Sequence, residues 1–215
     1  MDFPYFIIIS GPPASGKTTL GWQLKNHYNL PFIYKDLIKE SLFDTLGIAD
    51  SEWSGKLGYS SVVLLYKLLD EILSAKKSLI FESAFLGYKE SGNTKNIIEK
   101  YHAKPIEIHC NASSEIIIER FKKREKSSER HKGHHRSNVI QDLEERLLHG
   151  VYGSLSLDNN VVQWQTDDFA KLSLSDLITK IDTIQKDSNL GNPNFLIFKN
   201  KDIDNKVKCL NDDRT

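Results

Sequence analysis

Phe6-Ile7-Ile8-Ile9-Ser10-Gly11-Pro12-Pro13-Ala14-Ser15-Gly16-Lys17-Thr18-Thr19-Leu20 is the stretch that decides the fold of this 215-residue chain. It contains the G-x-x-x-x-G-K-[ST] pattern of a phosphate-binding loop, between Gly11 and Thr18. The unbroken apolar run over residues 6–9 predicts a buried parallel strand before the loop. After the loop, Leu20, Leu24 and Tyr28 are four residues apart, as on one face of a helix. The pattern and its surroundings therefore agree on a strand, a phosphate-binding loop and a helix.

The chemistry of this loop follows from its residue types. Gly11 and Gly16 permit backbone torsions and a close approach that a Cβ atom would prevent. N–H groups of the loop and of the helix N-terminus can then point at anionic oxygens. A glycine-rich turn that binds nothing is the alternative interpretation of the same residues. We expect the loop to hold the phosphates of ATP through Gly11, Pro12, Pro13, Ala14, Ser15, Gly16, Lys17, Thr18 and Thr19.

Three side chains in this region have more specific expected roles. Lys17 adds a positive charge near the β- and γ-phosphates, and the Thr18 hydroxyl is placed to ligate Mg²⁺. Residues 78–82 predict a further strand, which ends on Glu82. A strand ending on an acid is a loose form of the second NTPase motif, where the acid meets Mg²⁺ directly or through water. Apolar runs also end on glutamate without any such role.

The composition indicates an ordinary folded protein. Apolar residues make up 39% and charged residues 27% of the chain, and Lys+Arg and Asp+Glu both total 29. A net charge of zero indicates neither a nucleic-acid nor a membrane surface. No apolar run approaches membrane-spanning length, and the N-terminus lacks the pattern of a signal peptide. Cys110 and Cys209 are far apart, and Cys110 is expected to be a buried free thiol, which favours a reducing, cytoplasmic setting.

Apolar periodicity predicts the remaining elements. It gives strands at 30–34, 105–110 and 160–165, and helices at 37–46, 60–75, 96–102, 113–121, 137–147 and 174–181, with loops at 48–58 and 83–92. Beyond residue 186 the chain is rich in Asn, Asp and Lys. We therefore predict one domain over residues 1–186, with a lid at about 120–137, and a polar, partly disordered tail over 187–215.

Asp36 stands where a predicted strand hands over to a predicted helix. Aspartate is a good N-cap residue, and capping is one interpretation of this position. The other is a carboxylate at the carboxyl end of a parallel strand, facing the ligand crevice. The two interpretations are compatible.

The most unusual composition lies between Arg120 and Arg136, where eight Lys/Arg stand against two glutamates. Its net charge of +6 contrasts with zero for the whole chain. Such a run is a solvated basic loop in most proteins. In a phosphate-binding protein, however, its cations can close over the phosphates and stabilise transition-state charge. Three histidines, at 131, 134 and 135, surround Gly133, but their spacing and the lack of a nearby cysteine do not favour a structural zinc site.

The element order β-α-β-α-α-β-α-β-α-α-β-α predicts an α/β fold with a parallel sheet covered by helices on both faces. To about residue 185, the chain resembles the P-loop kinase group. It looks most like small predicted kinases related to chloramphenicol phosphotransferase, zeta-toxin-type sugar-nucleotide kinases, gluconate kinase and polynucleotide 5′-kinase domains. The match is carried by residues 11–19, 35–47, 81–83 and 130–134. The resemblance implies a three-layer P-loop NTPase fold with five strands in the order 2-3-1-4-5 and a basic lid.

The resemblance also implies roles for single residues. Asp36 matches the acid that accepts the substrate hydroxyl proton in several of these kinases. Arg120 and Arg124 resemble an arginine pair of adenylate-kinase-like proteins, of which the first lies against adenine and the second reaches the phosphates. Arg130 would be an arginine of the lid. Glu82 departs from the aspartate that many P-loop proteins carry, so whether it contacts the metal directly stays open.

We therefore expect a kinase that uses ATP and Mg²⁺ to transfer the γ-phosphoryl group to a small-molecule hydroxyl. A nucleic-acid 5′-end kinase and a non-catalytic ATP-binding sensor are the alternatives, and we expect neither nucleic acid nor membrane as a partner. The sequence does not identify the acceptor. The expected catalytic residues are Lys17, Asp36, Arg124 and Arg130, those for the metal are Thr18 and Glu82, and the aromatics that line the acceptor pocket or pack in the core are Trp53, Tyr59, Phe85 and Tyr88.

Overall fold

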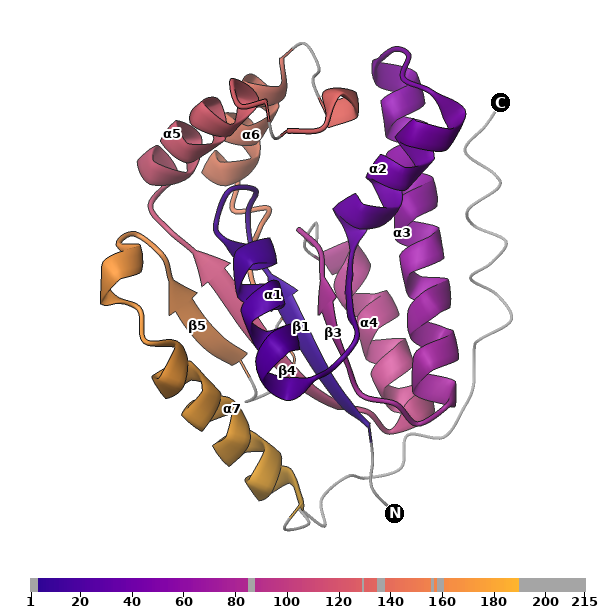
Figure 1. Ribbon diagram of the computed structural model, residues 1–215, viewed down its shortest axis with the longest axis vertical. Coiled ribbons are helices and arrows are strands. Elements are labelled where there is room, and N and C mark those ends of the chain that lie inside the picture. The colour runs from indigo at the N-terminus through magenta and orange to yellow at the C-terminus, as the bar shows by residue number, and fades with distance from the viewer. Residues whose placement is uncertain are drawn as a thin grey trace.

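Parallel strands form one sheet in the order β2-β3-β1-β4-β5 (Figure 1). The computed structural model describes residues 4–84, 88–128, 130–134, 138–155, 157 and 161–189. In that part of the chain the sheet has five strands, and both the predicted α/β class and the predicted strand order are confirmed. The strands are β1 (Tyr5–Ser10), β2 (Phe32–Tyr34), β3 (Leu79–Glu82), β4 (Lys104–Asn111) and β5 (Val161–Gln165).

The central strand β1 is buried on both faces. Phe6, Ile7, Ile8 and Ile9 are completely buried, which explains the unbroken apolar run in the sequence. Alternate side chains enter different cores, because successive residues of a strand point to opposite faces. Ile7 and Ile9 pack with α1 (Lys17–Tyr28) and α7 (Leu174–Asn189). Phe6 and Ile8 pack with α3 (Ser51–Ser74) and α4 (Tyr88–Tyr101).

The remaining helices surround the carboxyl end of the sheet, where the phosphate-binding loop lies. In Figure 1, α5 and α6 lie on one side of this end and α2 lies on the other. These elements are α2 (Lys35–Leu46), α5 (Ser114–Glu125) and α6 (Val139–Leu148), with short 3₁₀ helices η1 (Lys132–His134) and η2 (Phe169–Lys171). The carboxyl ends of β1, β2 and β3 therefore lie side by side at this edge of the sheet, and β2 passes directly into α2.

Two predicted loops are wrong. The predicted loop at 48–58 is mostly helix, because α3 begins at Ser51. Asp50 caps this helix, and its carboxylate accepts a hydrogen bond from the Trp53 backbone N–H at 2.8 Å. Gly55 and Gly58 lower helix propensity by about 1 kcal/mol each, but the cap and packing against α2 outweigh that cost. The predicted loop at 83–92 is wrong from Tyr88 onwards, because α4 begins there.

The predictions about the two cysteines and the C-terminal tail can be compared with the structure only in part. Cys110 is a buried free thiol, as predicted, whereas Cys209 and the greater part of the predicted tail lie outside the described residues. Helix α7 continues to Asn189, beyond the predicted end of the domain at 186. Within the described part of the chain, no helix combines the length and the apolar character needed to cross a membrane.

Candidate active site

The phosphate-binding loop connects β1 to α1 in a conformation that needs glycine. Gly11 has a φ of 124°, and a Cβ atom on it would lie 1.9 Å from the Cys110 carbonyl oxygen. Gly16 has a φ of 85° and stands at the N-cap of α1, where it has no side chain to cap the helix. The first-turn N–H groups of a helix have no intrahelical partner, so they can bind an anion. The loop therefore has the backbone shape expected of a phosphate cradle.

Lys17 lies inside this loop. Its Nζ donates a hydrogen bond to the Pro12 carbonyl oxygen at 2.7 Å and lies 4.0 Å from Glu82 Oε1. Burial lowers the pKa of Lys17, and the charge of Glu82 opposes that shift. The ammonium is thus held at the mouth of the cradle by two oxygen atoms that an anionic ligand can supplement.

Thr18 and Glu82 form an oxygen-rich pair beside Lys17. The Thr18 hydroxyl donates to Glu82 Oε2 at 2.9 Å, and Glu82 is buried. Burial raises the pKa of Glu82, while the charge of Lys17 lowers it. A hydroxyl and a carboxylate are the oxygen ligands that Mg²⁺ prefers, and Mg²⁺ commonly takes only one or two side chains plus phosphate and water. In agreement with such a sparse site, the described residues include no cluster of three or more His, Cys, Asp or Glu able to hold a metal.

Asp36 lies in the first turn of α2, immediately after β2. Its interpretation as an N-cap is wrong, because Tyr34 occupies that position. Asp36 Oδ1 pairs with Lys35 Nζ at 2.8 Å. Burial alone would raise the pKa of Asp36, but Lys35, then His134 and Lys17, lower it by more, so that it ends well below its ordinary value. The structure therefore presents an ionised carboxylate at the strand end.

Arg120 joins α5 to the segment that follows β5. Its guanidinium donates to the carbonyl oxygens of Thr166 at 2.7 Å and Asp167 at 3.2 Å, and lies 4.2 Å from the centroid of the Phe169 ring. The same ring, 51% exposed, lies against Gly16. Phe169 is not among the predicted site residues, although an aromatic residue shortly after a strand's carboxyl end was a usable signal. Arg120 and Phe169 together form a wall beside the phosphate-binding loop.

Arg124 and Arg130 differ in environment. Arg124 is exposed on α5, whereas the Arg130 side chain is only 8% exposed. Arg130 forms an ion pair with Glu125, and its guanidinium lies 5.0 Å from the centroid of the Phe121 ring. Burial lowers the pKa of Arg130, and Glu125 opposes that shift. The basic segment is therefore not a uniformly solvated loop, since residues 120–125 belong to α5 and Arg130 is packed against it.

One cavity brings these residues together. It has a volume of about 1680 Å³, larger than the 300–1,000 Å³ of an ordinary small-molecule site. Between α3 and α4 its wall is mixed, with Tyr59, Val62, Tyr66 and Ile97 together with Lys67, Asp70 and Lys100. Trp53 is not in this wall, and its indole N–H donates to the Gly47 carbonyl oxygen at 3.0 Å. Phe85 and the Tyr88 side chain lie outside the described residues. The predicted site residues that line the cavity are Pro13, Ala14, Gly16, Lys17, Thr18, Thr19, Asp36, Glu82, Arg120, Arg124 and Arg130.

A family model described as an AAA domain matches residues 6–147. No curated protein matches the sequence. Among solved structures, a candidate kinase from Chloroflexus aurantiacus is similar to this chain, with 32% identity and a TM-score of 0.78. The match covers 85% of this chain and 98% of that one.

More distant structures share the fold. Chaetomium thermophilum Kti12, solved in complex with ADP-AlF3, is 17% identical, with a TM-score of 0.60, and the match covers 84% of this chain and 97% of that one. A shikimate kinase from Acinetobacter baumannii, solved in complex with shikimate, is 18% identical, with a TM-score of 0.52. That match covers 87% of this chain and 96% of the kinase. The resemblance to the small P-loop kinase group is confirmed by these matches.

Proposed function

Because the chain belongs to the AAA domain family and has the fold of small P-loop kinases, we propose that it transfers the γ-phosphoryl group of ATP to a hydroxyl of a small molecule. The observation that carries this proposal is the position of Asp36. Its ionised carboxylate lines the same cavity as Lys17 and Thr18 of the phosphate-binding loop. Binding of a nucleotide alone has no need of an acceptor-side carboxylate at this place.

The nucleotide would occupy the loop and the wall beside it. Backbone N–H groups of residues 11–19 would bind the phosphates, with Lys17 beside the β- and γ-phosphates. The base would lie against Arg120 and Phe169, which stand next to Gly16. Thr18 and Glu82 fit a Mg²⁺ ion, which would neutralise charge on the phosphate oxygens when bound.

The acceptor would lie on the Asp36 side of the cavity. An ionised carboxylate accepts a hydrogen bond from the acceptor hydroxyl and so orients its oxygen towards the γ-phosphate. Arg124 and Arg130 line the opposite wall, where their positive charge can stabilise the negative charge of the transferred group. Positioning and charge stabilisation supply most of the catalysis in this class of reaction, with little covalent chemistry by the protein.

Phosphate transfer from labelled ATP tests this function. The purified chain would be incubated with Mg²⁺ and ATP together with a panel of hydroxyl metabolites, a 5′-hydroxyl oligonucleotide, or no acceptor. We expect label on a metabolite, and none with the Lys17→Ala variant. Label only on the oligonucleotide would indicate a nucleic-acid end kinase instead. Slow release of ADP without a labelled acceptor in any arm would indicate a nucleotide sensor.

A further inference from the structure

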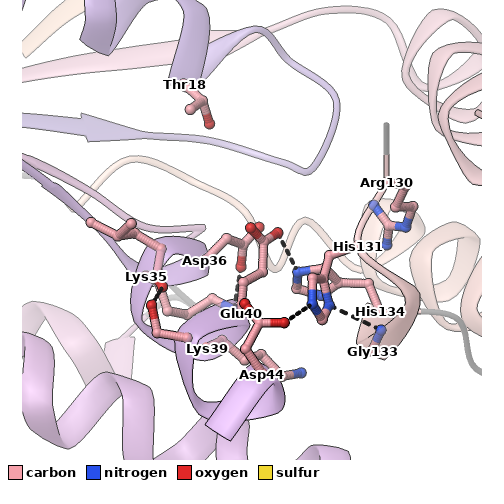
Figure 2. Close-up of polar contacts among 12 residues, drawn as sticks. Thr18, Lys35, Asp36, Lys39, Glu40, Asp44, Arg130, His131, Gly133 and His134 are labelled. Carbon is pink, nitrogen blue, oxygen red and sulfur yellow. Dashed lines mark hydrogen bonds and ion pairs between the residues drawn. The ribbon is translucent and has the colours of Figure 1, made fainter. Parts of the chain in front are cut away.

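Residues 131–134, here called the docked turn, lie against α2 through two histidines (Figure 2). His134 Nε2 lies 2.9 Å from Glu40 Oε1, and His131 Nε2 lies 3.1 Å from Asp44 Oδ1. Because the two carboxylates are four residues apart on α2, they present two contacts along one helix face. The contacts join parts of the chain that are roughly ninety residues apart.

An aromatic ring fills the space between the two histidine contacts. The Phe43 ring stacks on His131 with a centroid distance of 5.6 Å and an interplanar angle of 17°, and it meets His134 edge-on at 6.0 Å. Phe43 is 2% exposed. A Cβ atom on Gly133 would lie 2.3 Å from this ring, so only glycine fits without displacement of the docked turn. The docked turn is therefore closely packed on α2.

Each histidine of the docked turn presents its Nε2 atom to a carboxylate of α2. The Gly133 N–H donates to His131 Nδ1 at 3.1 Å, which places the proton of the neutral ring on Nε2, facing Asp44. Burial lowers the pKa of His134 to about 3. The neutral His134 ring can then donate its Nε2–H to Glu40, whose carboxylate would otherwise lose a partner.

Arg130 lies between the docked turn and α5. Arg130 precedes the docked turn directly and is held from the other side by Glu125 and the Phe121 ring of α5. Asp36 lies one turn before Glu40 on α2, and both line the cavity with Arg130 and His134. The contact between the docked turn and α2 thus links the segment that carries Arg130 to the helix that carries Asp36.

We propose that His134 is a positioning residue that, through Glu40, docks residues 131–134 on α2 and so places Arg130 opposite Asp36. The docking itself is independent of any activity, whereas its catalytic consequence rests on the proposed function. Two kinds of measurement therefore test it, and one of them does not depend on phosphate transfer.

Limited proteolysis measures the docking directly, because trypsin cleaves after Arg130 and Lys132. We expect His134→Ala to raise the cleavage rate at these two bonds by about tenfold, as loss of roughly 1.4 kcal/mol from a partly buried hydrogen bond would do. His134→Gln keeps an N–H donor and should stay within about twofold of the wild type. His149→Ala, on the exposed end of α6, is the matched control and should change nothing. A wild-type chain cut as fast as His134→Ala would overturn the proposal.

A second pair of variants tests the packing. Gly133→Ala should also accelerate cleavage, because its methyl group meets the Phe43 ring. In a Phe43→Ala background the ring is gone, and Gly133→Ala should add little further acceleration. Equal acceleration by Gly133→Ala in both backgrounds would show that the ring does not hold the docked turn. Thermal melting of each variant establishes that cleavage reports local opening and not global unfolding.

Measurements of kcat and of nucleotide affinity separate this proposal from the proposed function. With an active acceptor, His134→Ala should lower kcat by about tenfold and leave the affinity for a non-hydrolysable ATP analogue within about threefold, and His134→Gln should restore kcat. If no acceptor is ever phosphorylated, the proposed function fails while the proteolysis result still decides the docking. An undocked His134→Ala variant with full kcat would refute the positioning role.

Discussion

Thr18 Oγ1 donates a hydrogen bond to Glu82 Oε2 at 2.9 Å, which joins the first turn of α1 to the end of β3. The contact exists because β1 and β3 are parallel neighbours in the sheet, so their carboxyl ends lie at the same edge. It places two oxygen ligands suited to Mg²⁺ beside the Lys17 ammonium.

Replacement of Glu82 should therefore change the response to Mg²⁺. We expect Glu82→Gln to raise the Mg²⁺ concentration needed for half-maximal turnover by roughly tenfold, because a neutral amide attracts the cation less. A Mg²⁺ titration at saturating ATP measures this, with Glu115→Gln on the exposed face of α5 as the control. An unchanged Mg²⁺ midpoint in Glu82→Gln would show that the carboxylate has no part in metal binding.

Loss of the Asp36 carboxylate should affect turnover more than nucleotide binding. We expect Asp36→Asn to lower kcat by roughly 10²- to 10⁴-fold, the usual contribution of a positioned proton acceptor. The affinity for an ATP analogue, measured by calorimetry, should stay within about threefold of the wild type, since the phosphate-binding loop is unchanged. A variant with kcat within threefold of the wild type would remove Asp36 from the mechanism.

The depressed pKa of Asp36 also predicts the acid side of the pH profile. A carboxyl whose pKa is lowered in the folded state is ionised at all pH values above its unfolded value of 3.8. Turnover between about pH 5 and pH 9 should therefore show no loss that comes from protonation of Asp36. Measurement of kcat over this range tests it, and an acid limb with a midpoint above about pH 5 would require another group or a different environment for Asp36.

His134 should make the free energy of unfolding depend on pH. Its pKa falls from 6.5 to about 3 on folding, so between these values the unfolded chain binds a proton that the folded chain excludes. Acidification below about pH 6.5 then lowers the free energy of unfolding, by at most about 1.4 kcal/mol per pH unit from this group. Glu40, whose pKa is raised by burial and by Asp36, acts in the opposite direction above pH 4.5.

Denaturant unfolding at several pH values isolates the His134 contribution. We expect the free energy of unfolding to fall less steeply between pH 6.5 and pH 5 in His134→Gln than in the wild type. The informative quantity is the difference in free energy of unfolding between the wild type and His134→Gln at each pH, because other groups contribute almost equally to both proteins. Parallel curves would mean that His134 titrates normally and is not excluded from water.

Phe169 should affect recognition of the base without affecting recognition of the phosphates. We expect Phe169→Ala to weaken ATP binding by roughly tenfold, through loss of an aromatic face beside Gly16 and Arg120. Binding of inorganic tripolyphosphate, which has no base, should be unchanged and serves as the matched ligand control. Calorimetry with both ligands checks this, and an equal loss for the two would place Phe169 in support of the loop instead.

Much of the fold follows from local patterns. The apolar run at residues 6–9 predicts a central strand because a strand buried on both faces has no polar position. The start of α3 at Ser51 was not predicted, because Gly55 and Gly58 disfavour a helix locally. Its cap at Asp50 and its packing along α2 outweigh this preference, and the packing is a tertiary effect that no local window contains.

The candidate site likewise contains residues that the sequence predicts and contacts that it does not predict. Lys17, Thr18, Asp36 and Glu82 could be selected from the sequence, because parallel strands bring their carboxyl ends to one edge and the residues there must be neighbours. The surroundings of Arg130 could not be predicted from the sequence. Whether this arginine faces solvent or pairs with Glu125 depends on the path of the chain after α5, which charge composition does not specify.

The sequence by itself determined the phosphate-binding loop, the order of helices and strands and the acids at the strand ends, because each depends on residues close together in the chain. Tertiary structure alone decided that His134 meets Glu40, that Gly133 meets Phe43 and that Arg120 meets the segment after β5. These contacts join residues tens of positions apart. Their geometry is set by how whole helices pack, and packing depends on the shapes of all the side chains between them.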